Sequence, residues 1–468
     1  MKRRHFLASA AALGAAASPL LLTGAQAQAV DYKALVCIFL YGGNDGINMV
    51  TPRDATRYGQ YAAVRGQLAL PQAQLFSSGS GWGVDYGLHP SMSALGTAWT
   101  DGALAPVFNV GPLYQPLTKA EFRAAPNNGK IVPDSLFSHS DQQTLWETAY
   151  HDVFKPTGWG GRAAQTRPTT VMSVGGNGRF GISELAAPLV LPGPGSGFGI
   201  DGYFGGNQAM RRTALDTLYA QADTPILHNA FAGQQRDAFS VATALAPTLQ
   251  ITPGNTASEP INAAFAPVTS GGNLTSGLAN QLYQIAKLIE YRGSLPSSIG
   301  STRHVYFATM GGFDTHGDQI AGNSLTGDHA NLMKELADAS AAFYGAMKTL
   351  GLVNNVTTFT QSDFGRTFAP NSSNGTDHAW GNMQLVLGGS VIGTSSYGAY
   401  PELRIHGAND VGQDSWENEG RWLPTTSVDQ YAATLLRWWG LNEGQIDGVL
   451  PNLPNFGSAR NVGFMKPA

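Results

Sequence analysis

The sequence predicts an α/β protein built on a doubly wound, mostly parallel sheet. Residues 34–41 read ALVCIFLY, a continuous apolar run that suits a strand buried on both faces. Similar short apolar segments recur along the chain, and most of them are followed by glycine or an acidic residue. Amphipathic helical patterns lie between the later segments. We therefore expect a three-layer domain whose ligands bind at the carboxyl ends of the strands.

Six segments are the expected strands. The first ends in the turn GGNDG, and the full set is 34–41, 104–110, 171–174, 304–309, 356–361 and 384–387. One helical period runs from Leu332 to Leu350, and a second runs from Leu278 to Ile289. Ser427 followed three residues later by Gln430 is a capping-box pattern, which predicts the start of the last helix.

The stretch 189–276 has a different composition. The sequence PGPGSG precedes a helical middle part, and TSGG follows it. Glycine and proline at both borders predict an insertion or a cap over the main sheet, inside a domain that spans 30–468.

Composition excludes some classes of function. The 468 residues include 28 Lys and Arg against 32 Asp and Glu, and no basic cluster follows the first four residues. This charge disfavours nucleic acid as a partner. Because Cys37 is the single cysteine, a bound metal must be held by His, Asp or Glu.

Residues 1–29 have the pattern of an export signal. A basic start, KRRHFL, precedes an apolar, alanine-rich stretch and the small-residue segment AQAQA. The paired arginines resemble a twin-arginine signal, with cleavage after Ala27 or Ala29, and the alternative is an ordinary Sec signal. The apolar stretch is too short to span a bilayer. We expect a periplasmic or extracellular protein with no stable membrane insertion after cleavage.

Five polar clusters lie directly after predicted strands or in nearby turns. Each alone is typical of a turn in which Asp accepts backbone N–H bonds and Gly supplies a positive φ. Together they bring three histidines and several aspartates into a chain of only 13% charged residues, which favours a metal site. The five are GNDG (43–46), FSHSD (137–141), FDTH (313–316), SDFGR (362–366) and GTDHAWGN (375–382).

Longer phrases around these clusters resemble a known bacterial family. FLYGGNDGINMVTP, SHSDQQTLWE, GGFDTHGDQ, QSDFGRT and GTDHAWGN, in this order, are similar to domain of unknown function 1501, within the alkaline phosphatase and sulfatase superfamily. The resemblance covers nearly the whole mature chain. It implies an alkaline-phosphatase-like fold and metal-dependent hydrolysis of phosphate or sulfate esters. The superfamily also includes phosphodiesterases and phosphomutases, so the fold alone does not set the substrate.

The resemblance also implies metal ligands. Asp314, His316 and His378 match one nearly complete site for zinc, manganese or calcium. Asp45, Asp363 and the Ser138 nucleophile match a second site that has lost a ligand.

Phe364 stands where the superfamily places a histidine or an asparagine, and a phenyl ring cannot bind a metal. One metal is therefore expected rather than two.

Four further residues are expected to act in catalysis, in substrate binding or in support of the metal ligands. Ser138, at a helix start, is the expected nucleophile toward phosphorus. Arg366 is expected either to bind the substrate's oxygens with its guanidinium fork or to pair with a structural carboxylate. His139 is expected to act behind a ligand, to transfer a proton, or to face the core. Asn44 is expected to orient the first carboxylate or to contact substrate.

Two readings of the function remain open. Type I sulfatases form their nucleophile in a C/S-x-P-x-R setting, and the segment SHSDQ lacks both Pro and Arg. This excludes that sulfatase type but not other ester hydrolases. The alternative to an enzyme is a non-catalytic secreted or cell-surface protein that retains the fold, which Phe364 favours.

Overall fold

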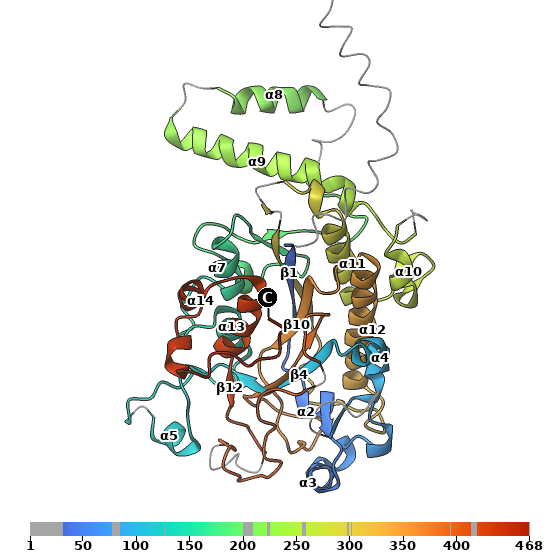
Figure 1. Cartoon of the computed structure of the whole chain (residues 1–468), viewed down its shortest axis with the longest axis vertical. Helices are drawn as coiled ribbons and strands as arrows, with labels where there is room; N and C mark the ends of the chain where they lie inside the picture. Colours follow the sequence, from blue (N-terminus) through green and yellow to red (C-terminus); the bar gives the residue numbers. More distant parts are fainter. Residues whose placement is uncertain are drawn as a thin grey trace, which may run out of the picture.

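An eight-stranded mixed sheet forms the centre of the protein, with the strand order β12-β4-β11-β10-β1-β9-β5-β6 (Figure 1). The computed structural model describes residues 31–76, 85–125, 127–199, 209–221, 225–254, 259–296, 299–300, 302–393, 395–412 and 419–467. The predicted signal peptide at 1–29 lies outside these residues.

All six predicted strands are confirmed. Every neighbouring pair in the sheet is parallel except the two pairs made by β11, which runs antiparallel to β10 and β4. The strands are β1 (Lys33–Leu40), β4 (Leu104–Gly111), β5 (Val171–Ser173), β6 (Leu189–Val190), β9 (Arg303–Met310), β10 (Val356–Ser362), β11 (Asn382–Leu387) and β12 (Thr426–Ser427). β2 (Val50–Pro52) and β3 (Tyr86–Leu88) form a separate hairpin.

Strand β1 divides the interior into two cores. Val36 and Ile38 belong to one core, whereas Leu35, Cys37 and Phe39 belong to the other. Successive side chains of a strand point to opposite faces, so an all-apolar strand must be covered on both sides. The predicted three-layer α/β class is confirmed.

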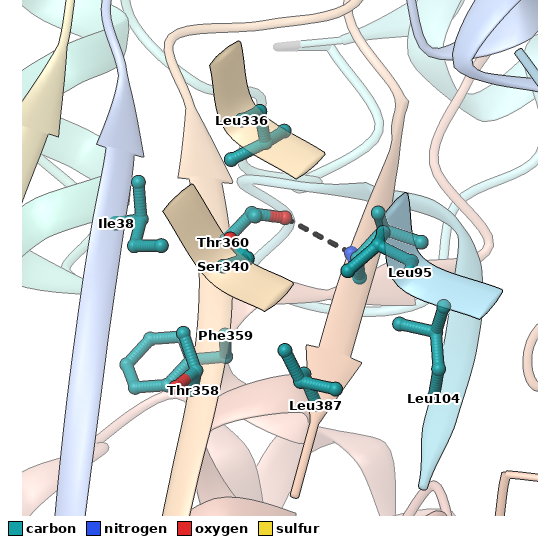
Figure 2. Close-up of a pocket in the computed structure, with 10 residues that line it drawn as sticks. Ile38, Leu95, Leu104, Leu336, Ser340, Thr358, Phe359, Thr360 and Leu387 are labelled. Atoms are coloured by element: carbon teal, nitrogen blue, oxygen red, sulfur yellow. Dashed lines mark hydrogen bonds between the residues drawn. The ribbon is translucent and has the colours of Figure 1, made fainter. Parts of the chain in front are cut away.

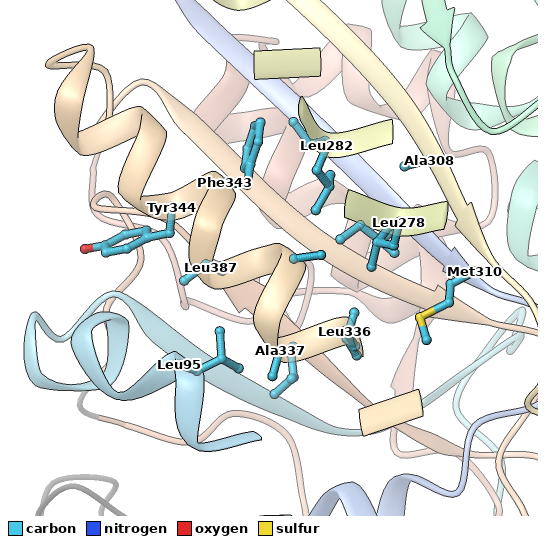
Figure 3. Packing of buried hydrophobic residues seen from close by; sticks show 14 of the residues in the cluster. Leu95, Leu278, Leu282, Ala308, Met310, Leu336, Ala337, Phe343, Tyr344 and Leu387 are labelled. Atoms are coloured by element: carbon cyan, nitrogen blue, oxygen red, sulfur yellow. The ribbon is translucent and has the colours of Figure 1, made fainter. Parts of the chain in front are cut away.

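Each core is closed by its own helices. Figure 3 shows Leu278 and Leu282 of α11 near Leu336 and Phe343 of α12 on one face of the sheet. That side holds α4 (Gly96–Thr100), α10 (Asn262–Phe265), α11 (Gly277–Glu290) and α12 (Asp328–Thr349). The other side holds α6 (His139–Thr148), α7 (Trp159–Gln165), α13 (Val428–Trp439) and α14 (Glu443–Val449). The capping box predicted at Ser427 is present.

The remaining short helices lie at the loops: α2 (Gly46–Met49), α3 (Ala55–Arg65) and α5 (Lys119–Ala124). None of the described helices is long and apolar enough to cross a membrane.

The predicted insertion contains the helices α8 (Ala209–Tyr219) and α9 (Ile226–Leu249), followed by a small hairpin of β7 (Thr269–Ser270) and β8 (Asn273–Leu274). Figure 1 shows α8 and α9 beyond the end of the sheet where β1 begins, whereas α2, which follows β1, lies toward the other end. These two helices therefore do not cover the carboxyl ends of the strands.

A small cavity lies between the sheet and α12 (Figure 2). Its volume is about 20 Å³, enough for roughly one water molecule. Leu336 and Ser340 of α12 line it together with Thr358 and Thr360 of β10. The Thr360 hydroxyl accepts a hydrogen bond from the Leu385 backbone and donates one to Gln384, so this hydroxyl is satisfied.

Removing a side chain at this cavity should be costly. Leu336 is only 2% exposed and already borders empty space. We expect Leu336→Ala to lower the free energy of unfolding by about 3–5 kcal/mol, because the deletion enlarges an existing cavity. Urea unfolding measures this change. Lys334→Ala, on an exposed position of the same helix, should change the unfolding free energy by less than about 0.5 kcal/mol, and a similar loss in both variants would contradict the cavity explanation.

A buried histidine should make stability fall in acid. His304 is buried on β9, where Nδ1 lies 3.1 Å from the hydroxyls of Tyr32 and Tyr306. Burial lowers the pKa of His304 to about 4 from an ordinary 6.5. Because the folded-state pKa is depressed, stability is full above pH 6.5 and decreases as the pH falls toward 4. Over that window we expect His304→Gln to remove roughly 3 kcal/mol of the pH-dependent loss, measured by urea unfolding. An unchanged slope would contradict this role.

Candidate metal centre

Four chain segments meet at the carboxyl edge of the sheet. The ends of β1, β9 and β10 lead there directly, and β11 begins there because it runs antiparallel. Two glycines after β1 allow the close approach. A Cβ on Gly42 would lie 2.4 Å from the backbone nitrogen of Asp314, and one on Gly43 would lie 2.4 Å from the Phe364 ring. Both glycines also have a positive φ. The topology thus brings the predicted polar clusters together.

Three histidines and one aspartate converge at this edge. His139, Asp314, His316 and His378 each offer one ligand atom, and these atoms lie within 4.8 Å of one another. Oδ1 of Asp314 is 3.2 Å from Nε2 of both His139 and His316, and 3.5 Å from Nε2 of His378. Among the described residues this is the one group of three or more such side chains that could hold a metal ion.

Each of the three imidazoles is fixed through its other nitrogen. Nδ1 of every histidine has a hydrogen-bond partner at 2.6 Å, which leaves Nε2 for the centre of the group. Metal-binding histidines characteristically use the second nitrogen in this way, because the partner sets the tautomer and the ring orientation. The partners are Asp363 Oδ2 for His139, Asp377 Oδ1 for His316 and the Phe137 carbonyl for His378.

The donor atoms of the group also fit a metal. Nε2 of His139 is buried and has no hydrogen-bond partner among the described residues. The hydrogen bond to Asp363 raises the pKa of His139, while burial lowers the pKa of His378 to about 4. Three imidazole nitrogens and a carboxylate suit zinc or manganese. Calcium, which takes six to eight oxygen ligands, does not fit this donor set.

Arg366 holds the Asp314 carboxylate from inside the protein. Nη2 of Arg366 lies 2.5 Å from Asp314 Oδ1. The other contacts of the guanidinium are hydrogen bonds to backbone carbonyls: Nη2 donates to Gly42, Nε to Gly43 and Nη1 to Thr376. Burial would raise the pKa of Asp314, but the hydrogen bond and charge of Arg366 outweigh it and lower the pKa. The predicted fork on substrate oxygens does not match this geometry, because the guanidinium is buried. Pairing with a carboxylate, the alternative, is what the structure shows.

Asp363 and His139 have roles that differ from those predicted. Asp363 is fully buried, and its Oδ2 accepts hydrogen bonds from Gly42 N, Gln143 Nε2 and His139 Nδ1. It therefore lies behind His139 instead of joining the ligand group. His139 itself faces the centre, because it begins α6 at the edge where β10 ends.

Asp45 and Asn44 lie in a separate buried network. Both oxygens of Asp45 accept from Arg65, at 2.6 and 2.8 Å, and Gln319 donates to the same carboxylate. Burial would raise the pKa of Asp45, but the charge of Arg65 lowers it. The arginine supplies the positive charge that a metal was predicted to supply. Asn44 is fully buried, with its side chain on Met49 and His329, so it does not face a substrate.

Ser138 stands immediately before α6 and the ligand His139. Its hydroxyl makes no capping hydrogen bond and lies 3.3 Å from the Ser140 hydroxyl. Phe364 packs its ring against His139 and His378, with centroids 4.7 and 4.5 Å apart. The phenyl ring therefore packs against two candidate ligands at the position where a ligand was expected.

Sequence reasoning assigned no role to Asp377 or Gln143. Asp377 precedes His378 in the quoted phrase GTDHAWGN, so a carboxylate next to a candidate ligand was an available signal. Gln143 follows His139 by four residues on α6, and such spacing places both side chains on one helix face.

A family model described as protein of unknown function (DUF1501) matches residues 300–420. Over these residues the chain is similar to the DUF1501 family. This confirms the resemblance seen in the sequence. The matched part contains three members of the candidate metal group, Asp314, His316 and His378, whereas His139 lies outside it. Among curated proteins, none matches the sequence.

Three of the solved structures that are similar to this chain have low sequence identity to it. Ps i-CgsB in complex with k-i-k-neocarrahexaose has 9% identity and a TM-score of 0.34, covering 89% of this chain and 74% of its own. Ps i-CgsB without that ligand has 10% identity and a TM-score of 0.34, covering 92% and 77%. A mutant of alkaline phosphatase PafA has 14% identity and a TM-score of 0.19, covering 72% and 63%. At TM-scores this low the structures assign neither a residue nor a reaction to this chain.

Proposed function

We propose that this protein is a hydrolase of phosphate or sulfate esters that uses one divalent metal, with zinc or manganese as the fitting ions. The observation that carries the proposal is the convergence of three histidine Nε2 atoms and the Asp314 carboxylate. The Nδ1 atom of each histidine forms a hydrogen bond with a residue outside the group. Partners of this kind set the tautomer and the orientation of each ring, which a metal site requires.

The group is also open on one side. The side chains of Asp314 and His316 are 50% and 45% exposed, whereas Arg366 behind them is buried. An ester group can therefore approach from solvent while the protein holds the ligands from the inside. Open access distinguishes a catalytic metal site from a closed structural one.

A bound metal would supply Lewis-acid stabilisation of the negative charge on the transferring group. The chain's own residues do the rest. The Ser138 oxygen forms a bond to phosphorus or sulfur as the bond to the leaving oxygen breaks, and the serine proton passes through solvent to that oxygen. Water then hydrolyses the serine ester and restores the hydroxyl. Arg366 keeps Asp314 ionised and in place throughout.

Metal analysis and substrate screening test the proposal together. The mature protein is stripped with a chelator, reloaded with zinc, manganese or calcium, and assayed on nitrophenyl phosphate, bis-nitrophenyl phosphate and nitrophenyl sulfate. We expect about one equivalent of zinc or manganese and hydrolysis that returns with either metal but not with calcium. Folded protein that binds none of these metals would contradict the metal centre. Metal binding without hydrolysis of any ester class would instead support the non-catalytic alternative.

The proposed location is outside the cytoplasm, by the twin-arginine route. Lysine keeps the charge of arginine but not its planar fork. We expect replacement of both Arg3 and Arg4 by lysine to leave the precursor in the cytoplasm, measured by cell fractionation and precursor size. Normal processing of the double variant would indicate a Sec signal.

A further inference from the structure

Three residues form a closed set of contacts around the backbone and Nδ1 of His378. The Phe137 carbonyl accepts from His378 Nδ1 at 2.6 Å, and the His378 carbonyl accepts from Arg421 Nε at 2.6 Å. The Arg421 guanidinium carbon lies 4.9 Å from the centre of the Phe137 ring, which closes the set. We call Phe137, His378 and Arg421 the His378 clamp. Its members come from three segments that are distant in the sequence.

Phe137 has an unfavourable backbone conformation in this clamp. Its φ is 74°, in the left-handed region that a bulky side chain rarely adopts. Such a conformation is energetically costly and persists only where the surroundings hold it. The Phe137 ring packs against a small apolar cluster that includes Leu113 and Trp380, and its face lies under Arg421.

Arg421 is itself held in place. Its side chain is 4% exposed, and Nη2 lies 2.5 Å from Glu419 Oε2. Its backbone N–H donates to the Asp410 carboxylate at 3.0 Å. The guanidinium is therefore fixed by an ion pair at one end while it stacks on Phe137 and binds the His378 carbonyl at the other.

We propose that Arg421 is a positioning residue of the metal centre. It touches no ligand atom of the group, yet it holds the His378 backbone and the residue that binds Nδ1. Both contacts restrict rotation of the imidazole about its side-chain bonds, so Nε2 stays directed at Asp314. This inference rests on the proposed function, because it assigns Arg421 a part in holding the metal of that site.

Loss of the clamp should weaken metal binding without removing a ligand. Without Arg421, the His378 imidazole can rotate in the metal-free protein, so metal binding must fix its orientation. The strained Phe137 backbone can also relax and move its carbonyl away from Nδ1. Changes to residues behind a ligand commonly cost 10–100-fold in metal affinity. Lysine cannot stack and bind a carbonyl in the same geometry, so it should not restore the site.

The experiment measures zinc affinity of Arg421→Met and Arg421→Lys by competition with a chromophoric chelator. We expect roughly 10–100-fold weaker binding than in wild type. The absorption spectrum of the cobalt-loaded protein should also change, because the imidazole direction sets the ligand field. Arg437→Met is the matched control, since Arg437 forms an equivalent ion pair with Glu443 on α13 and should bind zinc like wild type.

The outcomes separate this inference from the proposed function. If wild type does not bind zinc or manganese, the metal centre itself is wrong. If wild type binds zinc and both Arg421 variants match it in affinity and cobalt spectrum, only the positioning role is overturned. If the Arg421 variants do not fold, Phe137→Leu tests the positioning role instead. This variant keeps the backbone carbonyl at residue 137 and keeps Arg421, but it removes the ring on which Arg421 stacks. We expect that variant to bind zinc several-fold more weakly, and unchanged affinity would overturn the proposal.

Discussion

His378→Ala should remove both the metal and the hydrolytic activity. His378 contributes one of four converging ligand atoms, and its Nε2 is 2.7 Å from that of His316. Alanine removes one of the four donors, and we expect the remaining two imidazoles and carboxylate to hold the metal too weakly for it to survive purification. A catalytic metal supplies several kcal/mol of transition-state stabilisation, so activity should fall by about 1,000-fold or more. Metal content by atomic emission and turnover of the best ester found measure the two losses.

A second histidine provides the control for this change. His151 lies outside the group, partly exposed and 3.5 Å from Asp152. His151→Ala should keep one equivalent of metal and full turnover. If His378→Ala bound zinc as tightly as wild type, His378 would not be a ligand, and the four-residue group would be wrong.

The fold could be predicted because β1 is apolar and buried from Ala34 to Leu40. Both faces of β1 are covered, so the sequence pattern and the packing express the same requirement. The meeting of distant segments at one sheet edge also follows from topology, since parallel strands deliver their carboxyl ends there. The antiparallel direction of β11 carries no signal in its composition, because a strand buried on both faces reads the same in either direction.

The division between ligands and supporting residues could not be predicted. Asp363 and His139 both follow the polar patterns of ligands, yet a buried carboxylate lies behind a histidine that faces outward. That order depends on how far α6 sits from β10, a distance that no local pattern encodes. The sequence shows that the carboxylates and histidines exist, but only packing decides which atom reaches the centre.

Charged pairs that are distant in the sequence were also beyond sequence reasoning. Arg65 lies twenty residues after Asp45 at the end of α3, and both side chains are fully buried. A buried carboxylate must have a partner, which is a metal or a cation. The sequence is compatible with either a metal or a cationic side chain beside Asp45. In the folded protein that partner is Arg65.

Ser138→Ala should abolish turnover while metal content stays unchanged. If the Ser138 oxygen attacks phosphorus or sulfur, its removal deletes the bond-forming atom, and activity should fall by at least about 1,000-fold. Stability should change by less than about 1 kcal/mol, because Ser138 precedes α6 without making a capping hydrogen bond. Turnover, metal content and thermal unfolding, measured on one preparation, give the three values.

Ser140→Ala is the matched control for the nucleophile, since its hydroxyl lies 3.3 Å from that of Ser138 and it stands in the first turn of α6, which Ser138 precedes. It should retain metal and most of the turnover. Full activity in Ser138→Ala would exclude the serine ester and leave water as the attacking group, while His378→Ala would still lose activity. Equal loss in both serine variants would instead point to the start of α6 as a whole. The contrast among the three variants therefore assigns the attacking atom separately from the metal that activates the ester.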